Sequence, residues 1–189
     1  MSDGELIERS RTGDTHAFTQ LVKRYEQLVY GFSYKVCRDK EKAEETLQDT
    51  FINVYRKLSQ FNGESKFSTW LYSIVTNNCL MKRRKRKLDT EMVSLDDPPV
   101  SDKHEQRTIP AWTDSPISSL MNSELRARLD KAILKLPMEY RVVFILRDVE
   151  NQTAEEAAKI LKLSVPAVKS RLRRARLFLR KELNDLMVE

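Results

Sequence analysis

Glycine, histidine and cysteine are scarce in this chain of 189 residues, and their scarcity removes several classes of site. All four glycines lie within the first 63 residues, which leaves no glycine-rich phosphate loop and no dinucleotide-binding fingerprint. The two histidines are far apart in the sequence and flank no metal-ligand pattern, so we expect no metal and no cofactor. Two cysteines cannot build a disulfide framework, which favours an intracellular protein.

Long apolar segments are also missing. No run approaches the roughly 18 consecutive apolar residues that a membrane-spanning helix needs. The first ten residues, MSDGELIERS, lack the basic start and apolar stretch of a secretory signal. We therefore expect a soluble, cytoplasmic protein without membrane insertion.

Charge divides the chain into three parts. Residues 1–87 contain 17 basic and 11 acidic residues, and residues 117–189 contain 15 basic and 10 acidic residues. Residues 88–116 contain only two basic but seven acidic residues, together with four of the six prolines. An acidic, proline-rich segment between two basic parts is typical of a flexible linker. The sequence thus predicts two small domains, 1–87 and 117–189, joined by a linker over 88–116.

Both predicted domains have the apolar periodicity of helices. Apolar residues recur at helical spacing over 18–32, 43–61 and 125–136, and further helices are expected from Lys66 and from Pro137. No segment alternates apolar and polar residues for long enough to require a strand. We therefore predict an all-α fold.

The C-terminal part has the proportions of a helix-turn-helix. A short helix is expected over 153–161, with Thr153 as its N-cap and Glu156 at the capping-box position. After a turn at 162–164, a longer helix capped by Ser164 runs to about residue 186. Its apolar residues form one stripe that we expect to be buried: Val168, Leu172, Ala175 and Leu179. Lys162 stands where such turns commonly contain glycine, which puts the geometry of the turn in question.

The second helix of this motif has a one-sided charge. Between Lys169 and Lys181 there are seven basic residues and no acidic residue. A solvated helix face usually mixes both signs, because like charges in a row repel each other. Phosphates would relieve that repulsion, so the pattern predicts contact with duplex DNA. These seven basic residues are Lys169, Arg171, Arg173, Arg174, Arg176, Arg180 and Lys181.

A second basic cluster, KRRKRK over residues 82–87, follows a segment rich in aromatic and amide residues. The aromatic residues are Phe61, Phe67, Trp70 and Tyr72, and the interleaved polar residues include Ser65, Lys66, Asn77 and Asn78. Aromatic rings stack on unpaired bases, amides bind base edges and cations hold the backbone, so together they favour a single-strand site. The alternative is that some of these rings are simply core residues, and the pattern alone leaves both interpretations open.

Two stretches of the sequence resemble a known family. AEETLQDTFINVYRKLSQF (43–61) and FSTWLYSIVTNNCL (67–80) followed by KRRKRK resemble region two of bacterial sigma factors. AILKLPMEYRVVFILRDVENQTAEEAAKILKLSVPAVKSRLRRAR (132–176) resembles region four. The order of the two regions and the linker between them are similar to the extracytoplasmic-function (ECF) subgroup of the sigma-70 family.

The resemblance implies a transcription initiation factor rather than an enzyme. Such a protein binds core RNA polymerase, through the clamp helices of the largest subunit and the flap region, and directs it to promoter DNA. An anti-sigma factor is a further implied partner. For polymerase binding, the implied residues lie on the 43–61 helix: Glu45, Gln48, Asp49, Phe51, Asn53 and Arg56.

The resemblance also implies two DNA sites. At the minus-10 element, a flipped base and the opened strands would contact Phe61, Asn62, Ser65, Lys66, Phe67, Trp70, Asn77, Lys82, Arg83, Arg84 and Arg86. At the minus-35 duplex, the family's contact positions match Lys169, Ser170, Arg173 and Arg174, beside the basic Arg171 and Arg176. Lys162 in place of glycine, and Pro166-Ala167 where the family often has Gly-Thr, depart from the family pattern.

Two other functions compete with this interpretation. A stand-alone helix-turn-helix regulator would have a sensing domain with a ligand pocket in residues 1–87, and would bind an operator without polymerase. A nucleic-acid enzyme would need clustered carboxylates or a His/Cys site near the basic run, and residues 66–88 contain none. The aromatic and basic cluster argues against the regulator.

Overall fold

The computed structural model describes the backbone of residues 1–89 and 121–185, and the side chains of residues 1–82 and 127–183. Within these ranges the chain forms helices and no strand, which confirms the predicted all-α fold. The N-terminal group contains α1 (Asp3–Arg11), α2 (Thr15–Cys37), α3 (Lys40–Lys57), the 3₁₀ turn η1 (Leu58–Gln60) and α4 (Phe67–Asp89). The C-terminal group contains α5 (Met121–Lys135), α6 (Met138–Phe144), the π-helical turn η3 (Ile145–Val149), α7 (Ala154–Leu161) and α8 (Val165–Asp185).

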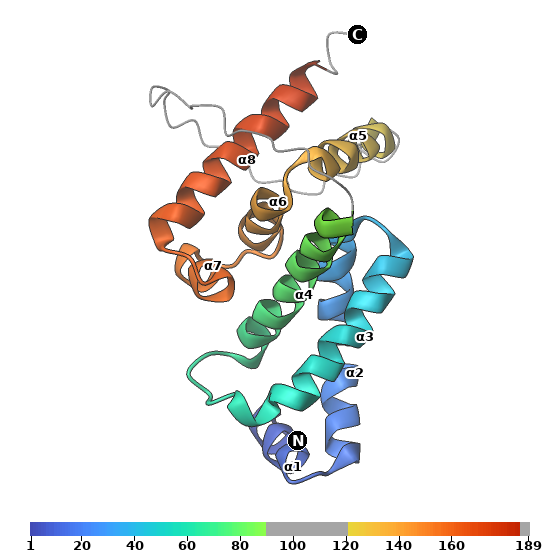
Figure 1. The fold of residues 1–189 in the computed structure, drawn as a ribbon, viewed down its shortest axis with the longest axis vertical. Coiled ribbons are helices and arrows are strands. Elements are labelled where there is room, and N and C mark those ends of the chain that lie inside the picture. The colour runs from blue at the N-terminus through green and yellow to red at the C-terminus, as the bar shows by residue number, and fades with distance from the viewer. Residues whose placement is uncertain (90–120, 186–189) are drawn as a thin grey trace.

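Helix α4 continues to Asp89, so the first two residues of the predicted linker are helical. Residues 90–116, the rest of that linker, lie outside the described residues. Figure 1 shows the two groups of helices one above the other, with α4 and α7 side by side where the groups meet.

Helix α1 is not predicted by apolar periodicity, because Leu6 and Ile7 are its only buried apolar residues. Its signal is a capping box: the Ser2 hydroxyl accepts a hydrogen bond from the Glu5 N–H (3.3 Å), and the Glu5 carboxylate accepts one from the Ser2 N–H (2.7 Å). The helix is tied to α2 by Arg24, which forms an ion pair with Asp3 at 2.5 Å.

The long helices α2 and α3 each begin at an aspartate. Asp14 accepts a hydrogen bond from the N–H of Ala17 (2.9 Å), and Asp39 accepts one from that of Lys42 (3.1 Å). Such caps stabilise a helix by about 0.5–2 kcal/mol. The apolar stripe of α2 then packs against α3 and α4, which makes a three-helix core for the N-terminal group.

The helix-turn-helix forms as its sequence predicts. Thr153 and Glu156 make the reciprocal capping-box bonds of α7, at 3.1 Å and 2.8 Å. The Ser164 hydroxyl caps α8 by accepting a hydrogen bond from the Ala167 N–H (3.3 Å). The four stripe residues of α8 are all buried: Val168, Leu172, Ala175 and Leu179.

Lys162 performs the role that glycine commonly has in this turn. Its backbone is left-handed (φ 54°, ψ 45°), a conformation that costs a residue with a Cβ roughly 1–2 kcal/mol. The next residue, Leu163, donates its N–H to the Ala158 carbonyl (3.0 Å), which closes the end of α7. Lys162 thus closes the turn in a left-handed conformation that glycine would adopt without this cost.

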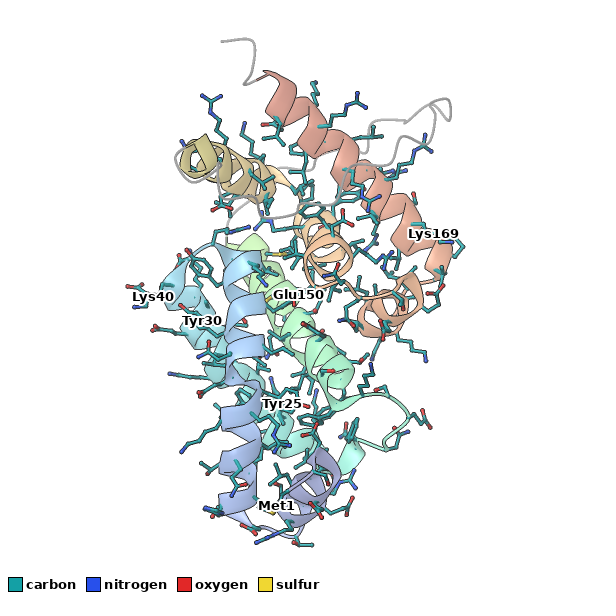
Figure 2. All side chains as sticks on the ribbon, turned by 180° about the vertical axis from the view of Figure 1, so that it is seen from behind. Met1, Tyr25, Tyr30, Lys40, Glu150 and Lys169 are labelled. Atoms are coloured by element: carbon teal, nitrogen blue, oxygen red, sulfur yellow. The ribbon has the colours of Figure 1, made fainter. Side chains whose placement is uncertain are left out.

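The two groups of helices share one hydrophobic cluster. It contains buried residues from both sides of the junction, among them Leu71 and Val75 of α4 and Ala157 and Ile160 of α7. Glu150, which follows η3, accepts hydrogen bonds from Lys35 of α2 and from the Tyr72 hydroxyl of α4, both at 2.6 Å. Figure 2 shows Glu150 at this junction.

Two arginines add polar contacts across the same junction. Buried Arg141 of α6 donates to the Val36 carbonyl in the last turn of α2 (2.9 Å). Arg38 forms an ion pair with Asp130 of α5 at 2.8 Å. In this structure the two groups are therefore packed together.

Candidate nucleic-acid interface

The outer face of α8 presents part of the predicted duplex-binding set. Lys169, Ser170 and Arg173 are exposed, and Arg171 is half-buried. Figure 2 places Lys169 near the start of α8, at the side edge of the molecule. Because the buried stripe anchors the opposite side of α8, these side chains are held toward solvent on a rigid helix.

Two other arginines of the predicted set make contacts within the protein. Arg176 binds both carboxylate oxygens of Asp148, at 2.8 Å from Nε and 2.6 Å from Nη2. This hydrogen bonding raises the pKa of Arg176 above its ordinary value. Arg174 is half-buried and donates to the Tyr140 hydroxyl at 3.2 Å. These residues join α8 to η3 and α6, a role that the pattern of charges did not indicate.

The aromatic residues before the basic run form a ring cluster. Phe61 and Phe67 are 8% and 4% exposed, and their ring centroids lie 5.4 Å apart. Half-buried Trp70 lies 5.3 Å from Phe61 and 5.6 Å from Phe67. Packing in the core covers both rings in this structure, where they contact Trp70, and a role of either ring in stacking on a base stays a prediction.

The polar residues of the predicted strand site are more accessible. Asn62 and Lys66 are exposed in the loop before α4, and Ser65 is half-buried there. The Asn62 side chain accepts a hydrogen bond from the Glu64 N–H (3.2 Å), which shapes this loop. Asn77 is exposed seven residues after Trp70, so both lie on one face of α4 about two turns apart.

Lys82 contacts two acidic residues, Glu45 and Asp49, that lie one turn apart on α3. Its Nζ lies 2.7 Å from Asp49 and 3.2 Å from Glu45. Burial lowers the pKa of the Lys82 ammonium, but hydrogen bonds to the two carboxylates outweigh it and raise the pKa overall. The resemblance implies DNA contact for Lys82 and polymerase contact for the two carboxylates, and the structure brings these three residues into one cluster. Arg83, Arg84 and Arg86 continue α4, with side chains outside the described set.

An open groove lies between the exposed side of α3 and the neighbouring helix α4. Asn53 donates to buried Asn78 (3.0 Å), and Gln48 and Arg56 are exposed. Phe51 is only 8% exposed and belongs to the core, so it can shape this face but does not offer its ring to a partner. The groove is lined by Asp49, Ile52, Asn53, Arg56, Asn78, Met81 and Lys82.

Two exposed apolar residues of this groove were missed in the sequence. Ile52 and Met81 are 49% and 53% exposed. Tyr55 is also 53% exposed, but it lies on the α2 side of α3, where its ring makes a T-shaped contact with Phe18 at 5.0 Å. Apolar side chains between charged ones are typical of a protein-binding surface.

No group of three potential metal ligands occurs in the part of the chain that the structure describes. None of the described helices is long and apolar enough to cross a membrane.

A helical protein with a helix-turn-helix, an exposed cationic recognition helix and a separate aromatic and amide surface belongs to the class of DNA-binding transcription proteins. The family profile for sigma-70 region 2 matches residues 21–88, and the profile for sigma-70 region 4 matches residues 126–179. The chain is 33% identical to the RNA polymerase sigma-H factor of Pseudomonas aeruginosa, over 99% of this chain and 96% of that protein. It is also 33% identical to the ECF RNA polymerase sigma factor SigW of Bacillus subtilis, over 95% of this chain and 96% of SigW.

This chain therefore belongs to the ECF subgroup of the sigma-70 family, and it is a promoter-specificity factor of RNA polymerase. The family membership favours this function over the stand-alone regulator. Two solved structures share the fold. The first is CnrH in complex with the cytosolic domain of CnrY, with a TM-score of 0.66 and 24% identity over 97% of both chains. The second is the sigma factor RpoE in complex with the anti-sigma factor NepR from Bartonella quintana, with a TM-score of 0.63 and 23% identity over 88% of this chain and 96% of that one.

Proposed function

We propose that the exposed residues of α8 read the minus-35 duplex. Exposed Lys169, Ser170 and Arg173 and half-buried Arg171 supply hydrogen-bond donors along this helix. Arg174 and Arg176 make contacts within the protein that tie this helix to α6 and η3.

The minus-10 strand is captured at the start of α4. The loop residues Asn62, Ser65 and Lys66 and the face formed by Trp70 and Asn77 offer donors, acceptors and one half-buried ring to an unstacked base. Phe61 and Phe67 contribute by packing beneath Trp70. Arg83, Arg84 and Arg86 follow on the same helix and would neutralise the phosphates of the opened strands.

Core polymerase docks on the α3 face. The groove combines the carboxylate of Asp49 with exposed Ile52 and Met81 and with the amide of Asn53, and the carboxylate of Glu45 is added through its ion pair with Lys82. That mixture suits a basic, partly apolar partner surface such as the clamp helices of the largest subunit, while the C-terminal domain would contact the flap region.

The division into a polymerase and minus-10 domain (1–87), a linker (88–116) and a minus-35 domain (117–189) is part of this proposal. So is an anti-sigma partner, because one of the solved structures named above is a complex of the sigma factor RpoE with the anti-sigma factor NepR. The protein would act in the cytoplasm beside polymerase, with no catalytic step of its own.

The observation that carries the proposal is the pairing of an exposed, one-signed recognition helix with a second, physically separate aromatic and amide surface. It is tested by run-off transcription from a pool of genomic promoter fragments, with core polymerase alone and with the protein added. We expect discrete transcripts only with the protein. Tight operator binding without polymerase and no new transcript would instead support a stand-alone regulator.

A further inference from the structure

A relay of three hydrogen bonds connects the core between α3 and α4 with the α3 groove. Asn53 donates its Nδ2 to the Oδ1 of Asn78 (3.0 Å), and Asn78 donates its own Nδ2 to the Thr50 hydroxyl (3.0 Å). Thr50 in turn donates to the carbonyl of Thr46, one turn earlier on α3 (2.6 Å). Thr46, Thr50 and Asn78 are buried, whereas Asn53 is half-buried and lines the groove. The relay therefore begins in the core and ends at the surface.

The buried end of the relay fixes the direction of every bond in it. A backbone carbonyl can only accept, so the Thr50 hydroxyl must donate its single proton to Thr46. The Thr50 oxygen can then only accept, which turns the Nδ2 of Asn78 toward Thr50 and its Oδ1 toward Asn53. Asn53 must meet that oxygen with its Nδ2. The opposite orientation of either amide would bring two acceptors or two donors together.

The relay leaves one atom of the Asn53 amide without a partner inside the protein. None of the residues that the structure describes donates a hydrogen bond to the Oδ1 of Asn53. The groove that Asn53 lines also contains the Asp49 carboxylate and the exposed side chains of Ile52 and Met81. Asn53 thus offers this groove a hydrogen-bond acceptor, and it does so in one fixed orientation.

We infer that Asn78 is a positioning residue, which holds Asn53 so that its Oδ1 accepts a hydrogen bond from the docked partner. This role rests on the proposed docking of core polymerase at the α3 groove. It also defines the chemistry of the partner: polymerase must place a side-chain N–H donor opposite Asn53, beside an apolar contact for Ile52 and Met81. Because a side chain that is already held in one orientation loses less entropy on binding, the relay should raise the affinity.

A double-mutant cycle on the affinity for core polymerase tests this role, with competition against a labelled sigma factor as the measurement. Asn53→Ala removes the acceptor and should weaken binding about fivefold. Asn78→Leu leaves Thr50 bonded to Thr46 but frees the Asn53 amide to turn, so binding should weaken about threefold. The double variant should bind as Asn53→Ala does, because an absent amide cannot be misplaced.

The other outcomes overturn the inference, and they separate it from the proposed function. A further loss from Asn78→Leu in the Asn53→Ala background would show that Asn78 acts by another route than Asn53. Weakened binding in Asn53→Ala with normal binding in Asn78→Leu would remove the positioning role and leave the docking face in place. A normal affinity of Asn53→Ala would also overturn the inference, and only a normal affinity of Asp49→Lys as well would remove the docking face.

Two further variants separate the orientation of Asn53 from the stability of the fold. Asn78→Asp still offers Asn53 an acceptor, so it should keep the wild-type affinity, although burying a carboxyl lowers the free energy of unfolding. Thr76→Val, at a buried position of the same helix, removes a hydroxyl that has no partner among the described residues and should leave the affinity unchanged.

Circular dichroism melts record the stability of every variant, and Asn78→Ala replaces Asn78→Leu if the leucine variant does not fold. We expect affinity and stability to change independently across this set. An affinity that falls in Asn78→Asp as far as in Asn78→Leu would show that stability rather than orientation matters, and it would overturn the inference.

Discussion

Basic residues occur in both halves of the molecule, but their surroundings differ between α8 and α4. On α8, Lys169 is exposed in a stretch that contains no acidic residue. On α4, Lys82 lies against Asp49 and Glu45 of the neighbouring helix. A cation that already has a carboxylate partner must lose it before it can neutralise a phosphate, so it adds less to DNA affinity. Counting basic residues in a sequence therefore overstates the surface that is ready to bind DNA.

The largest effect is expected where the two halves meet. Glu150→Ala removes the acceptor shared by Lys35 and the Tyr72 hydroxyl, and leaving the hydroxyl of buried Tyr72 without a partner costs about 2 kcal/mol. We expect a lower urea midpoint and a larger radius of gyration by small-angle X-ray scattering. Glu64→Ala, in the exposed loop before α4, is the control. If Glu150→Ala kept the wild-type radius and midpoint, the contact would not hold the halves together.

The α3 face should show the next largest effect. Asp49→Lys reverses the charge at the groove and places a second ammonium beside Lys82, so the affinity for core polymerase should fall by about tenfold or more, roughly 1.4 kcal/mol. Competition binding against a labelled sigma factor measures this. Glu44→Lys changes the same charge on a different face of α3 and should bind normally, with circular dichroism to check both folds. Equal affinities of the two variants would remove this face from the docking site.

The sequence indicates local structure well because local structure depends on neighbours in the chain. The Thr153 and Glu156 capping box and the buried stripe from Val168 to Leu179 follow from spacing alone, and the fold confirms them. Helix α1 was missed because its signal is the Ser2 cap rather than apolar periodicity.

Contacts between distant residues could not be predicted in this way. Glu150 meets Lys35 and Tyr72 across separations of 115 and 78 residues, and no local pattern encodes such pairs. For the same reason, the burial of Phe61 under Trp70 and the pairing of Arg176 with Asp148 became visible only in the fold. The binding roles assigned to the individual site residues stay predictions.

The contrast between exposed and paired cations can be tested within α8 itself. Lys169→Ala should weaken binding to the minus-35 duplex by about 1 kcal/mol and reduce its salt dependence, because it removes one contact to DNA. Arg176→Ala should change that affinity little and instead lower stability by about 0.5 kcal/mol, since its partner is Asp148 in a partly exposed pair. Fluorescence anisotropy across a salt series and thermal melts separate the two. Equal losses of DNA affinity would contradict the distinction.

The smallest effect concerns the turn. Lys162→Gly removes the strain of a left-handed conformation at φ 54°, but it also raises the conformational entropy of the unfolded chain. We therefore expect the free energy of unfolding to rise by only about 0.5 kcal/mol. Lys159→Gly, in the interior of α7, should instead lose about 1 kcal/mol. Thermal melts decide between them, and a Lys162→Gly protein as unstable as Lys159→Gly would show that the left-handed lysine carries no strain.

The central claim is that strand capture and duplex recognition use separate surfaces of this protein. Permanganate reactivity of thymines near the start site measures it most directly, on a linear promoter and on the same promoter pre-melted by mismatches. With saturating holoenzyme, Lys169→Ala should open the linear promoter, whereas Asn77→Ala should open it about tenfold less and recover on the pre-melted one. Opening of the linear promoter by Asn77→Ala to the wild-type extent would contradict the account.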